Sequence, residues 1–247
     1  MMKIIFLGTN GWYDSDTGNT TCILIETNKE YIILDAGNGL YKIDKYIKSK
    51  KPIYLFLSHF HLDHIFGLHI LNKFNFIQGI KLYGPPGLKK ILNTIITQPY
   101  TMPFKQLKTK VTLFDINKKI KFPLNVEYKE LSHTALCYGY RFNLENKIIS
   151  YCPDTAMCDN LFLLAKDADL LISECSYKVN KEVKNWPHLN PKKAAFLAEK
   201  SNAKKLLLVH FDPNIYKEIS ERKEAQIAAG RIFGETIAAT DNLIINL

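Results

Sequence analysis

Arginine is scarce in this 247-residue sequence: Arg141, Arg222 and Arg231 are three of 33 basic side chains. The formal net charge is nevertheless +9, which favours an anionic partner. A face that binds nucleic acid normally concentrates cations and includes bidentate arginines, whereas these lysines are scattered along the chain. The charge pattern therefore favours a small anionic partner, with nucleic acid as the less favoured alternative.

Membrane-spanning runs and linker-like segments are also missing. No apolar run is long enough to cross a membrane, and no low-complexity or Pro/Gly/Ser-rich stretch divides the chain. Because 47% of the residues are hydrophobic, residues 1–247 are expected to bury one core as a single domain. The first apolar run breaks at Gly8 without a small-residue cleavage site, which predicts a strand rather than a signal peptide.

The five cysteines are an odd number without C-x-x-C spacing. We therefore expect reduced, mostly buried thiols and a cytoplasmic location. Cys152 and Cys175 lie near candidate site residues, but cysteine as a metal ligand is the less favoured reading, since histidines and aspartates supply enough ligands.

The hydrophobic pattern alternates between strand-like and helix-like segments. Short strands are expected near residues 3–7, 20–26, 31–35, 53–57, 80–83, 111–115, 125–131, 137–143, 147–151, 169–173 and 205–209. Helices are expected near residues 64–74, 87–97, 159–166, 191–201 and 217–230. Two sets of strands, each followed by helices, predict an α/β fold: a four-layer αβ/βα sandwich in which two sheets pack face to face under outer helices.

Three of the seven histidines fall within six residues, in the run from His59 to His64. The run reads H-x-H-x-D-H and follows an apolar, strand-like segment. Imidazole nitrogen and carboxylate oxygen are ligands that zinc and similar ions prefer. In extended backbone, His59, His61 and Asp63 share one face, while a turn brings His64 to a second position. This loop is therefore a candidate ligand source for two ions.

Matching ligand types recur farther along the chain. His133, Asp154 and His210 each follow an apolar, strand-like segment directly or nearly so. Each alone is weak evidence, because a single histidine or aspartate is more often structural. The repeated position at strand ends, where functional loops tend to lie, makes a shared site the better interpretation.

In its order of motifs, the whole chain resembles the metallo-β-lactamase fold superfamily. The resemblance implies that His59, His61 and His133 bind one metal ion, that Asp63, His64 and His210 bind a second, and that Asp154 bridges both. Two divalent ions roughly 3.5–4 Å apart repel each other, so an anionic group is needed between them. A metal-bound water, whose pKa falls to about 7, would supply hydroxide. Zinc is the expected metal, with manganese or iron as alternatives.

The segment from Ser173 to Tyr177, followed by residues 186–195, resembles the phosphodiesterase branch that includes ribonuclease Z. By that resemblance, Glu174 hydrogen-bonds His188 and fixes its tautomer, so that His188 protonates the leaving oxygen. The structural alternative is that His188 only caps or packs the turn before a helix that starts near Pro191, since Asn190 and Pro191 are typical N-cap and N1 residues. The predicted catalytic residues are Asp63, Glu174 and His188.

Two substrates compete within that branch. Ribonuclease Z enzymes carry a long tRNA-gripping arm between the histidine and bridging-aspartate motifs, whereas here only a hairpin is expected between His133 and Asp154. The motif H-x-H-L-D-H is in turn similar to that of class II cyclic nucleotide phosphodiesterases, and compact relatives include anti-Pycsar-type enzymes. The favoured function is hydrolysis of a P–O bond in a small cyclic nucleotide, preferably a cyclic mononucleotide, by metal-hydroxide attack.

Two other functions remain open: a ribonuclease Z-like tRNA 3′ processing endonuclease, and a metal-stabilised nucleotide-binding protein without turnover. Relatives of this kind are often homodimers, and a homodimer is expected here. The aromatic turn at Trp12 and Tyr13 could stack on a base or simply pack. The apolar loop at residues 99–104 could be a dimer contact or a pocket lid.

Overall fold

The computed structural model of this chain describes residues 2–117, 119–181, 183 and 185–247. Within these residues, the strands form two sheets. The first sheet has the spatial order β13 (Ile244–Asn246), β1 (Lys3–Gly8), β2 (Cys22–Glu26), β3 (Tyr31–Leu34), β4 (Ile53–Phe56), β5 (Ile80–Gly84) and β6 (Val111–Asp115). The second has the order β12 (Thr236–Ala238), β11 (Leu206–Val209), β10 (Leu170–Glu174), β9 (Lys147–Cys152), β8 (Cys137–Leu144) and β7 (Val126–Leu131).

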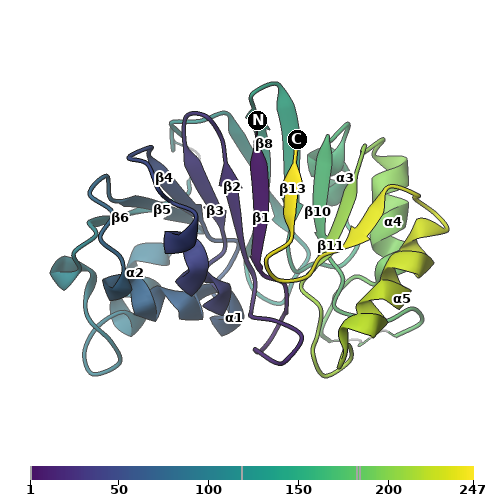
Figure 1. Cartoon of the computed structure of the whole chain (residues 1–247), viewed down its shortest axis with the longest axis horizontal. Helices are drawn as coiled ribbons and strands as arrows, with labels where there is room; N and C mark the ends of the chain where they lie inside the picture. The colour runs from purple at the N-terminus through teal and green to yellow at the C-terminus, as the bar shows by residue number, and fades with distance from the viewer. Residues whose placement is uncertain (1, 118, 182, 184) are drawn as a thin grey trace.

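Helices cover the outer face of each sheet, so the molecule has four layers (Figure 1). Beside the first sheet lie η1 (Asn38–Lys45), α1 (Leu62–Ile65), η2 (Phe66–Lys73) and α2 (Leu88–Ile95), with the short helix η3 (Phe104–Gln106) preceding β6. Beside the second sheet lie α3 (Asp159–Ala165), α4 (Pro191–Lys200) and α5 (Ile219–Gly230). The predicted α/β sandwich is confirmed.

Strand direction brings the loops that follow several strands to one edge. Strands β3, β4, β5 and β6 are parallel, as are β9, β10 and β11. Strand β7 runs in the same direction as β9, because both are antiparallel to β8. In sheets of this kind, ligands bind outside the carboxyl ends of the strands.

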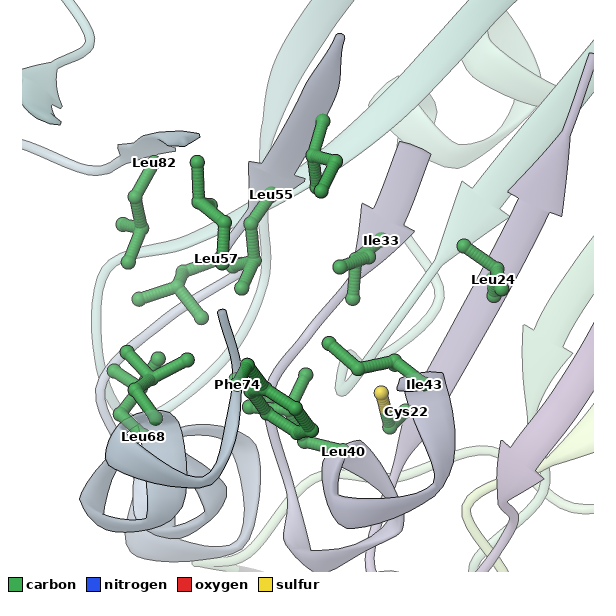
Figure 2. Packing of buried hydrophobic residues seen from close by; sticks show 14 of the residues in the cluster. Cys22, Leu24, Ile33, Leu40, Ile43, Leu55, Leu57, Leu68, Phe74 and Leu82 are labelled. Carbon is green, nitrogen blue, oxygen red and sulfur yellow. The ribbon is translucent and has the colours of Figure 1, made fainter. Parts of the chain in front are cut away.

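The core is apolar on both sides of each sheet. In β4, Tyr54 and Phe56 face the opposite sheet, while Ile53 and Leu55 face the helices. Both faces are buried, so such strands read as continuous apolar runs rather than as alternating patterns. Figure 2 shows the outer part of this packing, where Leu55 from β4 lies close to Leu57, and Leu68 and Phe74 lie on the helical side of the cluster.

The two sheets are joined by backbone pairing at the end of β1. Asn10 forms an isolated parallel bridge with Phe211, which follows β11. The amide of Gly11 donates to the carbonyl of Phe211, and the amide of Phe211 donates to the carbonyl of Thr9. The loop after β1 is thereby fixed against the loop after β11.

Several local features differ from the sequence prediction. The helix expected at residues 64–74 is a short α-helix followed by the 3-10 helix η2, because the amide of Gly67 donates to the carbonyl of Ala36 rather than within its own helix. The hydrophobic pattern of the sequence does not predict the short strands β12 and β13 or the helices η1 and η3. The five cysteines are free thiols, and only Cys158 is partly exposed.

None of the helices in the described part of the chain has the length and apolar character needed to span a membrane.

The centre of the interface between the sheets yields a stability prediction. Phe56 is fully buried, stacks on Tyr83 and makes edge contacts with Tyr140 and Phe142. Phe56→Ala should lower the free energy of unfolding by about 3–5 kcal/mol, because it removes apolar contacts and leaves a cavity. Urea unfolding measures this loss. Phe66→Ala, at a side chain that is half exposed, is the control and should stay within about 1 kcal/mol of the parent.

Candidate metal centre and active site

All seven side chains predicted as ligands lie together at the edge described above. His59 and His61 follow β4, and Asp63 and His64 lie in the first turn of α1. His133 follows β7, Asp154 follows β9, and His210 follows β11. The donor atoms of these seven residues form two groups: His59, His61, His133 and Asp154 in one, and Asp63, His64 and His210 in the other. A third, overlapping group brings His188 close to Asp154 and His210.

The second group surrounds a single point. The Nε2 atoms of His64 and His210 are 3.1 Å apart, and Asp63 Oδ2 lies 3.4 Å and 3.2 Å from them. Asp154 Oδ1 lies 3.3 Å and 3.1 Å from the same two nitrogens. Ligands about 2.0–2.1 Å from a tetrahedral zinc ion are spaced roughly 3.3 Å apart. The spacing of these four atoms therefore suits a divalent ion.

The first group lies on the other side of the Asp154 carboxylate. Asp154 Oδ2 is 3.9 Å from His59 Nε2 and 3.8 Å from His133 Nε2. His133 Nε2 is 3.3 Å from His61 Nδ1. Each oxygen of Asp154 thus faces a different group, which is the arrangement expected of a bridging carboxylate.

Asp35 fixes the orientation of two imidazoles. Its Oδ2 atom lies 2.8 Å from His64 Nδ1 and also accepts from the hydroxyl of Ser58 at 2.8 Å. Because the Ser58 proton is committed to Asp35, the Ser58 oxygen accepts from His59 Nδ1 at 2.9 Å. In their neutral forms, both imidazoles then carry their proton on Nδ1 and would present the Nε2 lone pair to a bound ion, as outer hydrogen bonds to ligating histidines do.

Ser176 acts on His210 in the same way. Its hydroxyl donates to the carbonyl of His210 at 2.9 Å and therefore accepts from His210 Nδ1 at 2.8 Å. The Nε2 lone pairs of His64 and His210 consequently face each other and two carboxylate oxygens. Such an arrangement of acceptors is stable only around a positive charge.

Two further observations support the fit to metal ions. Among the described residues, His59 Nε2 and Asp154 Oδ1 are buried without a hydrogen-bond partner. Burial lowers the pKa of His59, His61 and His133, the last to about 4, so these rings are neutral at pH 7. The neutral imidazole is the form that binds a metal ion.

The pKa values in the second group show that it favours positive charge. Burial opposes protonation of His64, but Asp63, Asp154 and Asp35 outweigh it and raise its pKa well above the usual value. Burial also works against ionised Asp63 and Asp154, yet the neighbouring histidines hold both pKa values well below the usual range. The carboxylates are therefore ionised at neutral pH.

The predicted pair Glu174 and His188 lies beside the cluster. Glu174 is fully buried at the end of β10, and its Oε1 atom lies 2.9 Å from His188 Nδ1. The amide of Thr155 also donates to this oxygen at 2.7 Å, which fixes the carboxylate. The N-cap of α4 is Asn190, which accepts from the amide of Lys193. His188 is thus not the cap of this helix.

A cavity of about 670 Å³ opens over these groups. Its polar wall includes Asp63, Asp154, His188 and His210. Trp12, Leu62, Val183 and Trp186 form much of its apolar wall. This volume lies within the usual range for a small-molecule site.

The loop after β1 completes the wall near Asp63. The amide of Trp12 donates to Asp63 Oδ2 at 2.7 Å. Gly11 packs so tightly on His210 that a β-carbon at position 11 would lie 2.4–2.8 Å from the imidazole. The buried guanidinium of Arg222 holds this loop by donating to side-chain oxygens of Thr9, Asn10 and Thr17.

Residues missed by the sequence analysis are those that orient the ligands: Asp35, Ser58 and Ser176. Asp35 could have been found, because it follows the apolar strand β3 in the same context as the predicted ligands. Ser58 and Ser176 have no comparable signal, since their roles depend on which neighbouring group takes their hydroxyl proton.

Comparison with known proteins agrees with this geometry. A family model described as "Beta-lactamase superfamily domain" matches residues 30–211. Ribonuclease Z of Bacillus cereus (strain AH187) is 26% identical over 310 residues, with 97% of both chains covered. That alignment is longer than this chain, so the relative contains segments that have no counterpart here.

Two solved structures share the fold. The metallo-β-lactamase fold protein YhfI from Bacillus subtilis superposes with a TM-score of 0.82 at 21% identity, covering 99% of this chain and 98% of that one. The short form of human tRNase Z gives a TM-score of 0.78 at 22% identity, with the same coverage.

The contact between Gly11 and His210 yields a prediction. Gly11→Ala should displace the His210 imidazole and weaken Zn²⁺ binding, by roughly 10- to 100-fold if the effect matches that of losing an orienting contact. Titration against a chelator measures the affinity. Gly230→Ala is the matched control, because a β-carbon there meets nothing within 4 Å. Equal Zn²⁺ affinity in the two variants would show that the contact between Gly11 and His210 does not position a metal ligand.

Proposed function

The chain belongs to the β-lactamase superfamily, and from this membership and the geometry of the cluster we propose that it is a metal-dependent phosphodiesterase acting on a small nucleotide. A cyclic mononucleotide is the favoured substrate. The observation that carries the proposal is the Asp154 carboxylate, whose two oxygens each face a separate group of donors.

In this proposal, His59, His61 and His133 would hold one divalent ion and Asp63, His64 and His210 would hold another, with Asp154 available to both. When bound, such ions supply an activated water and neutralise charge that develops on the phosphate. Zinc suits the nitrogen and oxygen donors, and manganese and iron are alternatives.

The surrounding residues contribute orientation and protons. Asp63 lines the cavity and is fixed by the Trp12 amide, so its carboxylate would orient the attacking water as the new P–O bond forms. His188 would donate its Nε2 proton to the departing oxygen as the old P–O bond breaks, while Glu174 holds Nδ1. The positions of Asp63, Glu174 and His188 support the catalytic roles proposed for them.

His188 is protonated at neutral pH in this environment. Burial lowers the stability of the charged imidazole, but the Glu174 carboxylate outweighs burial, and the pKa rises to about 9. A group that must give up a proton is best kept protonated at the working pH.

The size of the site favours a small substrate. Between His133 and Asp154, all residues are described and form only the β8–β9 hairpin, with its turn at Glu145 and Asn146. Two of the three arginines are used internally: Arg141 bonds the carbonyls of Leu164 and Lys166, and Arg222 is buried. The fully described segment between His133 and Asp154 therefore offers no long arm, and only one arginine of the described chain remains available, to bind a folded RNA.

A ribonuclease Z-like tRNA 3′ processing nuclease is the second candidate. It is favoured by the similarity to Bacillus cereus ribonuclease Z along nearly the whole chain. A nucleotide-binding protein without turnover is the third. The expected homodimer and cytoplasmic location remain predictions.

A substrate panel tests the proposal. Protein loaded with Zn²⁺ or Mn²⁺ should hydrolyse at least one of the cyclic mononucleotides in a panel that also contains cyclic dinucleotides and a precursor tRNA. Asp63→Ala should abolish this turnover. Product analysis by chromatography separates the candidates. Cleavage of the precursor tRNA alone, with a steep salt dependence, would establish the nuclease instead. Intact nucleotide after prolonged incubation would favour the binding protein.

The proton donor gives a separate pH prediction. His188→Ala should lower kcat by roughly 10²- to 10⁴-fold, because the leaving oxygen loses its acid, while bound zinc stays unchanged. In the parent, the rate should fall as the pH rises through about 9, where His188 loses its proton. Glu174→Gln should move this fall to lower pH, because it removes the charge that raises the pKa.

The seventh histidine supplies the control. His69 is exposed and lies outside the cluster, so His69→Ala should keep the parent rate and pH profile. Loss of zinc from His188→Ala would make His188 a ligand or a structural support, and an unchanged rate would remove its proposed role.

A further inference from the structure

Trp186 presents a flat aromatic surface at the edge of the cavity. Its indole lies parallel to the His61 imidazole, with ring centroids 5.5 Å apart and an angle of 10° between the planes. The side chain is nevertheless 47% exposed. His61 thus covers one face of the indole, and nearly half of the side chain remains accessible.

The backbone of Trp186 is fixed relative to His188. The hydroxyl of Tyr177 donates to the carbonyl of Trp186 at 2.7 Å, and the amide of Tyr177 donates to the carbonyl of Leu189 at 3.1 Å. The Tyr177 ring also makes an edge contact with the His188 imidazole. Tyr177 thus links the indole to the group that would face the leaving oxygen.

The cavity has room for more than a phosphate group. A phosphate between the two donor groups would contact only the polar wall, which leaves the apolar wall at Leu62, Val183 and Trp186 free. The centroids of Trp186 and His188 are 6.5 Å apart. A sugar whose oxygen leaves toward His188 would therefore place its attached base near the exposed part of Trp186.

We propose that Trp186 is the stacking platform for the substrate's nucleobase, so that the site prefers nucleoside phosphates to sugar phosphates. This inference rests on the proposed phosphodiesterase function and deepens it. Stacking on an aromatic ring tolerates any base, since every base has a π face. Trp12 is the less suitable platform, because its ring pairs edge-on with Tyr13 and its backbone amide orients Asp63.

Tryptophan fluorescence tests the proposal without relying on turnover. The chain has two tryptophans, so Trp12→Phe leaves Trp186 as the sole indole. Zinc-loaded Trp12→Phe protein is titrated with adenosine 5′-monophosphate and with ribose 5-phosphate, which lacks the base. The nucleotide should quench the emission and bind roughly 5- to 100-fold more tightly, which corresponds to the usual energy of one base stack.

A second pair of variants separates stacking from folding. By calorimetry, Trp186→Ala should reduce the ratio of adenosine 5′-monophosphate affinity to ribose 5-phosphate affinity to about one, and Trp186→Phe should keep part of the preference. Equal affinity for the two ligands in the parent, or a preference that survives in Trp186→Ala, would overturn the platform and leave the phosphodiesterase intact. If neither ligand binds and no phosphodiester in the panel is cleaved, both proposals fail.

Discussion

The buried carboxylate of Asp35 is the group on which the site depends. It lies after β3 in the first sheet and accepts from Tyr151 in the second sheet, from the amide and hydroxyl of Ser58, and from His64. A buried charge is tolerated when several donors satisfy it. Asp35 orients the His64 imidazole directly and the His59 imidazole through Ser58. One carboxylate therefore aligns a ligand from each donor group.

The ligand set could be predicted from sequence because its members share a context. His59, His133 and His210 each follow an apolar strand or lie close to its end, and parallel strands bring such positions to one edge. The tautomers could not be predicted, because they depend on hydrogen bonds between distant segments. Ser176, for example, orients His210 across 34 positions, and no local pattern reports which atom receives the Ser176 proton.

The fold was predictable where apolar runs were long and failed where tertiary contacts replaced local ones. Strands β4 and β11 are buried on both faces and stand out as continuous apolar runs. The segment at 64–74 has helical periodicity, but the amide of Gly67 bonds to Ala36 and the helix changes to the 3-10 form. Strand β13 has three residues and exists through its pairing with β1.

That pairing has a consequence for the order of synthesis. Strand β1 lies between β2 and β13, and the two termini lie side by side (Figure 1). During translation, β1 is made long before β13, so its outer edge stays unpaired until residues 244–246 have been made. The loop after β1 likewise lacks its hydrogen bonds to Arg222 and Asp241 until those residues have been made. A nascent chain therefore contains His59, His61 and His64 long before the residues that complete the pocket have been made. During that interval, the exposed edge of β1 can pair with the wrong strand.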